Sequence, residues 1–211
     1  MENRQTAIKQ MRTVLLSSAY LAPVEYYTKL LTYDKVLIEQ HDHYMKQTYR
    51  ELSLSIPIVK PDSPKCIMRD IRISDHGNWR HLHWNAISSA YNHTPFFEYY
   101  KDDFRPFYEK KYEFLADFNE ELCHLVCSLI DMQPDMQRTA EYRTELTLDE
   151  ADFREGIHPK KDFAQENTEF SPHPYYQVFQ DRLGFLPNLS IIDLLFNMGP
   201  ESLLVLQQSC K

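Results

Sequence analysis

The hydrophobic positions in the first forty residues follow a strand–helix–strand order. Residues 13–18 and 35–39 are short apolar runs of the kind that forms buried strands. Between them, Pro23 suits the first turn of a helix, and helical spacing continues through Val24, Tyr27, Leu30 and Leu31. The pattern predicts two parallel strands joined by a crossover helix.

Further along, the pattern predicts strands first and helices afterwards. Apolar residues alternate over 52–58 and, less regularly, over 67–73, as in half-buried strands. Residues 79–91 then have helical spacing, with Asn78 as the expected N-cap. A second helix is expected from Asp103 to about residue 131, with Pro106 in its first turn.

The last quarter of the chain combines a helix start with a helix stop. Ser190 and Asp193 fit a capping box, and Gly199 with Pro200 ends the run, after which 201–208 can form one more short helix. Residues 143–173 are charged and sparsely apolar, which indicates a long surface excursion or a lid. The prediction is therefore one α/β domain over residues 1–211, with a small mixed sheet followed by a mostly helical half.

Composition narrows the function classes. The chain has 211 residues, 43% of them hydrophobic, and a net charge of −8, which disfavours nucleic acid as a bulk partner. Its four glycines are too far apart for dinucleotide or P-loop motifs, so we expect no cofactor of those classes and no other cofactor motif is present. Four cysteines suggest reduced thiols, and no apolar run reaches the ~20 residues of a spanning helix, so we expect a cytoplasmic protein without membrane insertion.

A histidine pair follows the second predicted strand. His41 and His43 flank Asp42 where open α/β sheets bind ligands, outside the carboxyl ends of strands. One histidine could act as a general base near neutral pH, or the pair could bind metal, although no third ligand stands at a recognised spacing. A polar loop with hydrogen-bonded histidines is the alternative, and we expect no metal.

The next residues have the composition of a binding surface. Lys46 supplies a point charge and Arg50 a bidentate fork, which together suit a diphosphate or a carboxylate. Gln47 and Tyr49 lie between them. The alternative is a solvated strand whose charged positions face outward.

For several other polar residues, a structural role is an alternative to a functional one. On a helix, His81 and His83 point about 200° apart, so they cannot share a metal site, and His83 fits a hydrogen-bonded core position. Asp193 fits a helix cap and Asn197 a helix-end group, or both could form a polar rim on the pocket of Lys46.

Several segments together resemble the WbqC-like family, found in gene clusters for bacterial O-antigen and other surface polysaccharides. The resemblance covers nearly the whole chain. It rests on Tyr20, Pro23 and Tyr26-Tyr27, on 34–36, on Tyr44, Lys46 and Arg50, on 56–58, Trp79, Tyr91 and 95–97, and above all on Leu189-Ser190-Ile191-Ile192-Asp193-Leu194-Leu195-Phe196-Asn197-Met198-Gly199. Relatives usually carry a short hairpin between the positions of Arg50 and Leu52, whereas here the two are nearly adjacent.

The resemblance implies a role in surface-polysaccharide biosynthesis, with a glycine or other acyl transferase acting on an amino sugar as one reading. A non-catalytic binding or scaffold protein of the same pathway is the alternative, and a metal-dependent hydrolase using the histidine pair is a third. The expected partner is a small-molecule or nucleotide-linked sugar. The expected catalytic residues are His41, His43 and Asp193. The expected substrate-binding residues are Tyr20, Tyr44, Lys46, Gln47, Tyr49, Arg50, Tyr176, Gln177, Asn188, Ser190 and Asn197.

Overall fold

A computed structural model describes residues 11–44, 54–61, 63, 66–157 and 168–211. Its sheet has four strands in the order β3-β2-β1-β4. The strands are β1 (Thr13–Ser17), β2 (Lys35–Glu39), β3 (Met136–Arg138) and β4 (Glu150–Asp152). All three pairings are parallel, and antiparallel contacts among the described residues occur as isolated bridges. The predicted α/β fold is confirmed.

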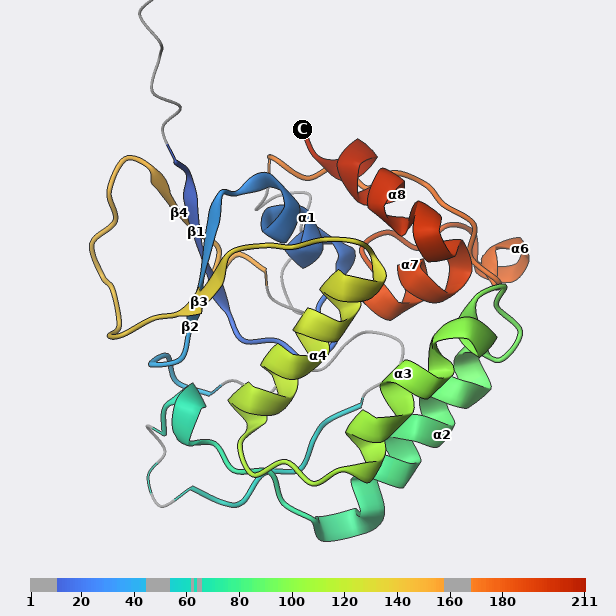
Figure 1. The fold of residues 1–211 in the computed structure, drawn as a ribbon, viewed down its shortest axis with the longest axis horizontal. Coiled ribbons are helices and arrows are strands. Elements are labelled where there is room, and N and C mark those ends of the chain that lie inside the picture. The colour runs from blue at the N-terminus through green and yellow to red at the C-terminus, as the bar shows by residue number, and fades with distance from the viewer. Residues whose placement is uncertain (1–10, 45–53, 62, 64–65, 158–167) are drawn as a thin grey trace, which may run out of the picture.

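The predicted strand–helix–strand opening is also confirmed. β1 pairs with β2 in register from Thr13–Lys35 to Ser17–Glu39, and α1 (Val24–Thr32) connects them (Figure 1). Val14, Leu15 and Leu16 are fully buried, as expected for a central parallel strand covered on both faces.

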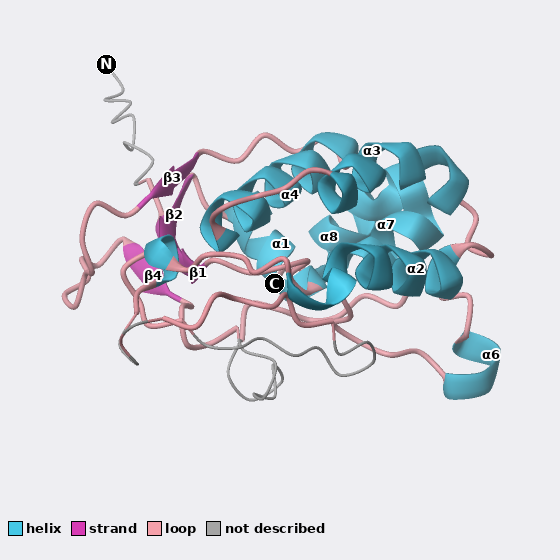
Figure 2. Cartoon of the chain, turned by 90° about the horizontal axis from the view of Figure 1, so that it is seen from below, coloured by secondary structure: helices cyan, strands magenta, loops and turns pink. Residues whose placement is uncertain are grey.

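Helices dominate the rest of the chain. Figure 2 shows the strands gathered at one end of the molecule and the helices filling the other. The α-helices are α2 (Trp79–Tyr91), α3 (Phe97–Glu109), α4 (Leu115–Leu129), α6 (Gln180–Leu183), α7 (Ile191–Met198) and α8 (Ser202–Ser209). The 3-10 turns are η1 (Met68–Asp70), η2 (His76–Asn78) and η3 (Gly199–Glu201).

The single helix predicted from Asp103 to residue 131 is wrong, because two helices, α3 and α4, occupy this region. Pro106 lies inside α3, near its end. The break follows from a competing backbone pairing: Ile73 N donates to Glu113 O and Leu115 N donates to Ile71 O, both at 2.9 Å. Asn78 begins α2 in the left-handed region, with φ of 49° and no capping hydrogen bond.

The strands predicted at 52–58 and 67–73 are not formed by the described residues of those ranges. Residues 54–58 contribute one isolated bridge, Ile58 with Ile73, and 67–73 contains η1. Ile71 and Ile73 are nevertheless buried, at 1% and 8% exposed. The alternating pattern therefore predicted which side chains are buried, although these residues do not pair as a strand. The excursion predicted at 143–173 contains β4, and its residues 158–167 lie outside the described part.

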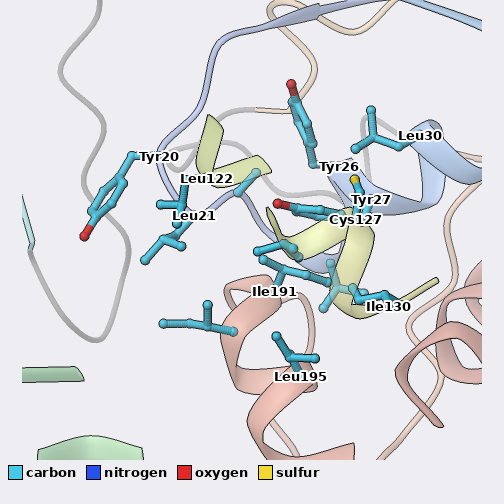
Figure 3. Packing of buried hydrophobic residues seen from close by; sticks show 14 of the residues in the cluster. Tyr20, Leu21, Tyr26, Tyr27, Leu30, Leu122, Cys127, Ile130, Ile191 and Leu195 are labelled. Carbon is cyan, nitrogen blue, oxygen red and sulfur yellow. The ribbon is translucent and has the colours of Figure 1, made fainter. Parts of the chain in front are cut away.

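One hydrophobic core joins the helices to the sheet. Figure 3 shows Tyr27 from α1, Leu122 and Cys127 from α4 and Ile191 from α7 converging. The four cysteines are free thiols, as predicted. Within the described residues, no helix combines the length and apolarity that crossing a membrane requires.

Candidate functional site

A cavity opens beside the carboxyl ends of β1 and β2, and we call it the strand-end cavity. Its volume is about 50 Å³. Since a water molecule needs roughly 10–15 Å³ by this measure, the cavity has room for about four heavy atoms. The lining residues are Ser17, Ser18, Tyr20, Asp42, His43, Tyr44, Leu54, Ile56, Met68, Leu115 and Asn119. This edge of a parallel sheet is where open α/β folds bind ligands.

Asp42 is the carboxylate of the strand-end cavity. Ser17 Oγ donates a hydrogen bond of 2.7 Å to Asp42 Oδ2, and Met68 N donates to the Asp42 backbone carbonyl. Partial burial raises the pKa of Asp42, and the nearby Glu39 adds to this, whereas the Ser17 hydrogen bond and Arg154 oppose it. The sequence analysis named Asp42 only as the residue between two histidines and predicted no role for its carboxylate.

The structure separates the two histidines of the predicted pair. His43 is exposed and lines the strand-end cavity. The ring of His41 turns to the sheet, where Nε2 lies 3.2 Å from Thr139 O, and its backbone N–H donates to Glu39 Oε1. Of the pair, His43 is therefore the one placed to meet a ligand in this cavity.

A buried ion pair holds this edge of the sheet together. Arg154 Nη1 lies 3.0 Å from Glu39 Oε2, while Thr139 Oγ1 donates to Glu39 Oε1 at 2.8 Å. Arg154 also binds Asp152, at the end of β4. The ends of β2, β3 and β4 are thus tied together by side chains that the sequence analysis did not single out, because their partners are about 100 residues apart.

Tyr20 enters the strand-end cavity from the loop between β1 and α1. It is 7% exposed, and its hydroxyl lies 3.1 Å from His83 Nδ1 and 2.8 Å from the Tyr108 hydroxyl. His83 is 4% exposed, which confirms its reading as a core histidine, and burial lowers its pKa to about 4, against an opposing hydrogen bond to the Ser55 backbone. Tyr44 also lines the cavity, and partial burial raises its pKa.

Asn119 on α4 lines the strand-end cavity and a second, smaller cavity beside it. The side chain is 4% exposed, and Nδ2 donates a hydrogen bond of 3.1 Å to Ser18 Oγ. Its carbonyl oxygen Oδ1 has no hydrogen-bond partner in the described part of the chain. An unsatisfied buried acceptor costs about 1–3 kcal/mol, so this atom requires an explanation.

The predicted polar residues around α7 form a buried network of their own, which we call the C-terminal brace (Tyr175, Gln177, Asp193 and Asn197). Tyr175 donates a 2.7 Å hydrogen bond to Asp193 Oδ2, and burial followed by this carboxylate raises the Tyr175 pKa. Asn197 Nδ2 donates to the Asp193 carbonyl at 2.8 Å. Gln177 exchanges two 2.9 Å hydrogen bonds with the Leu186 backbone. The network fixes the segment before α7 onto that helix, and Tyr176 beside it is 47% exposed.

Ser190 ties the start of α7 to the loop that carries Tyr20, and Asn188 ties it to the first turn of α1. The capping box predicted at Ser190 is not formed; its hydroxyl donates instead to Leu21 O at 2.8 Å. Asn188 Oδ1 accepts from Glu25 N, and Asn188 Nδ2 donates to Glu25 Oε2, both at 2.9 Å. Leu21 has a φ of 45°, a conformation that is costly for a branched side chain and occurs often beside binding sites.

The expected site residues therefore fall into three groups. Tyr20, His43 and Tyr44 line the strand-end cavity. The residues around α7 line neither of the two described cavities, so the structure does not bring them to the same lining as His43. Lys46, Gln47, Tyr49 and Arg50 lie outside the described residues. Within the described part, no three histidine, cysteine or acidic residues gather in a group that could hold a metal ion.

Comparison with known proteins identifies one family. The model of the WbqC-like protein family matches residues 18–154 and 148–205. No curated protein and no solved structure matches the chain. The matched span includes β2, the C-terminal brace and the lining of the strand-end cavity except Ser17.

Proposed function

The chain belongs to the WbqC-like protein family, and we propose that it transfers an aminoacyl or other small acyl group to an amino sugar during surface-polysaccharide assembly. Membership of the family suggests a role related to polysaccharides. The reaction is our own proposal, and the observation that carries it is the strand-end cavity, where His43 and Asp42 face a space of about 50 Å³. A glycyl group, with four heavy atoms, matches that volume.

In this proposal His43 acts as the general base. The amine of the acceptor sugar attacks the carbonyl of the activated acyl donor, a new N–C bond forms, and the bond to the donor's leaving group breaks. His43 accepts the proton from the attacking amine and passes it to the leaving group. Because His43 is exposed at the cavity, its ring can reach both partners without rearrangement of the core.

Tyr20, Tyr44 and Ser17 then have orienting roles. Tyr20 is held by His83 and Tyr108, and the hydrogen bond between Ser17 and Asp42 fixes the carboxylate. Positioned polar groups on rigid elements lower the entropic cost of bringing two reactants together. Lys46 and Arg50 are proposed to hold phosphate or carboxylate of the substrate, on the basis of their chemistry alone.

Product analysis tests this function directly. The protein is incubated with nucleotide-linked amino sugars and activated glycine, and the products are weighed by mass spectrometry. A mass gain of one glycyl group on the sugar, absent without protein, is the expected result. Unchanged sugar with every donor and acceptor pair would reject the transferase.

A binding role without catalysis is the second candidate, and one surface favours it. Tyr176, Phe179 and Leu183 are 47%, 47% and 59% exposed around α6. Apolar side chains gathered in this way are typical of contact with another protein. Thermal unfolding separates the two candidates: stabilisation by a pathway protein alone favours a scaffold, and stabilisation by nucleotide sugars favours the enzyme.

A further inference from the structure

The carboxylate of Glu39 holds the turn that carries Asp42 and His43. Glu39 is the last residue of β2 and is fully buried. Its Oε1 atom accepts hydrogen bonds from two consecutive backbone N–H groups, that of Gln40 at 2.9 Å and that of His41 at 2.8 Å. Such a carboxylate fixes the direction of the backbone, because both N–H bonds have to point at the same oxygen atom.

Two neighbours hold the Glu39 carboxylate itself in place. Thr139, which directly follows β3 and is 3% exposed, donates from Oγ1 to Glu39 Oε1 at 2.8 Å. Arg154 meets the other carboxylate oxygen, Oε2, at 3.0 Å. The acceptor of the two amides is therefore anchored to β3 and to the segment after β4, and its position does not depend on the turn. Supporting contacts of this kind keep a site in one geometry.

The turn leads directly into the strand-end cavity. Asp42 accepts the hydroxyl of Ser17 at 2.7 Å, and Asp42 and His43 both line the cavity, whereas Glu39 lines only the smaller cavity beside it. Two routes connect Glu39 to the strand-end cavity. One is the backbone of residues 40 and 41. The other is charge, because the pKa of Asp42 is raised by burial and also by the negative charge of Glu39.

We propose that Glu39 is a positioning residue for the strand-end cavity: by accepting the N–H groups of Gln40 and His41, its carboxylate places Asp42 and His43 in the lining. The inference rests on the proposed function for its effect on rate, because His43 is the general base there. A general base works only within hydrogen-bond reach of the proton that it takes, so a displaced His43 lowers kcat. Since Glu39 lies outside this lining, KM should change little.

Two double variants separate the hydrogen bonds of Glu39 from its charge. Both contain Arg154→Leu, which removes the cation, and they differ in having Glu39→Gln or Glu39→Leu. The side chain at position 39 is neutral in both, but only the amide keeps an oxygen that accepts the N–H groups of Gln40 and His41. Steady-state glycyl transfer is measured on the full chain. The Glu39→Leu double variant is expected to have a kcat about tenfold or more below that of the Glu39→Gln double variant, with KM within about threefold.

Amide hydrogen exchange reports the same contact without any substrate. The N–H groups of Gln40 and His41 should exchange about tenfold or more faster in the Glu39→Leu double variant than in the Glu39→Gln double variant, because exchange requires the hydrogen bond to open. The N–H of Val178, which donates to Asn197 Oδ1 at 3.1 Å in the C-terminal brace, is the control and should exchange equally in both.

Thr139→Val is the second variant and keeps both the charge of Glu39 and its ion pair with Arg154. It removes the hydroxyl that anchors Glu39 Oε1, so kcat should fall about threefold or more and the amides of residues 40 and 41 should exchange faster. This variant tests the inference even if the Glu39→Leu double variant does not fold. An unchanged kcat together with unchanged exchange in the folded Thr139→Val variant would then overturn it.

Equal kcat in two folded double variants would overturn the inference, and equal exchange of the two amides would overturn it whatever the protein's reaction is. Its failure is distinguishable from failure of the transferase. Faster exchange in a protein that transfers no glycyl group supports the positioning and removes the reaction. Glycyl transfer that is equally fast in both double variants removes the inference and leaves the reaction in place.

Discussion

The guanidinium of Arg154 and the carboxylate of Glu39 form a buried ion pair, with Nη1 and Oε2 3.0 Å apart. The Glu39 side chain is fully buried and that of Arg154 is 7% exposed. The pair lies at the carboxyl edge of the sheet, next to the residues that enter the strand-end cavity. Because a buried charge without its partner is costly, this contact makes the edge sensitive to substitution.

Arg154→Leu is expected to lower the free energy of unfolding by roughly 3–5 kcal/mol, because it leaves the Glu39 carboxylate buried without its cation. Urea denaturation measures the change. The double variant Glu39→Gln with Arg154→Leu should lose much less. Arg105→Leu, which breaks an exposed pair with Glu109, is the control and should cost about 1 kcal/mol or less. Equal losses in the two single variants would contradict the assignment.

Gly199→Ala is expected to destabilise the protein by about 2–4 kcal/mol. Gly199 has a φ of +55°, and an added Cβ would lie 2.5 Å from a carbon of the Phe96 ring. Gly184→Ala is the matched control, since Gly184 also has a positive φ, of +72°, but has nothing within 4 Å of the added Cβ. Thermal unfolding of both variants should therefore show a clearly larger loss at Gly199.

His83 should make stability depend on pH between about 6.5 and 4. Burial lowers its pKa from 6.5 to about 4, so the unfolded chain binds a proton in this range while the folded protein does not. The contribution is complete above pH 6.5 and is lost as pH falls toward 4, by an amount on the order of 3 kcal/mol.

His83→Gln should flatten the plot of unfolding free energy against pH in that window. The matched control is His81→Gln, on the exposed side of the same helix. A wild-type slope that persists in the His83 variant would show that another group titrates there.

His43→Ala is expected to reduce glycyl transfer by about 10²–10⁴-fold, the usual contribution of a general base. His41→Ala is the comparison, because the His41 ring meets Thr139 O instead of the cavity, and transfer per folded molecule should stay near the wild-type rate. Rates are measured from product mass under saturating substrates. Equal rates in His43→Ala and wild type would remove His43 from the mechanism.

Asp193→Ala tests whether the C-terminal brace takes part in chemistry or in structure. Tyr175 loses the acceptor of its 2.7 Å hydrogen bond, so unfolding should become easier by about 1–3 kcal/mol. Glycyl transfer per folded molecule should be unchanged, since Asp193 does not line the strand-end cavity. A stable variant with abolished transfer would instead place Asp193 in catalysis.

Some elements could be predicted from the local hydrophobic pattern alone. β1, α1 and β2 follow from apolar runs and a helical period within 27 consecutive residues, 13–39, and Gly199 ends α7 as its backbone freedom predicts. The rule for ligands at strand ends also directed attention to His43, and the structure places His43 in the lining of the strand-end cavity. These inferences needed no knowledge of distant partners.

Other features depended on partners far along the chain. β3 and β4 have three residues each, too few to be read from a period, and they exist because β2 and β1 pair with them. Ser190 has the pattern of a capping residue, but the loop at Leu21 offered its hydroxyl another acceptor.

The sequence by itself determined the family, the parallel opening of the sheet and one histidine of the candidate site. Only the tertiary structure decided which polar groups share a cavity: it placed Asn119 of α4 beside Ser18 and Asp42, and turned His41 away. The reason is physical. Secondary structure is encoded by periods of a few residues, whereas a site is made of hydrogen bonds and charges whose partners are brought together only when the whole core packs.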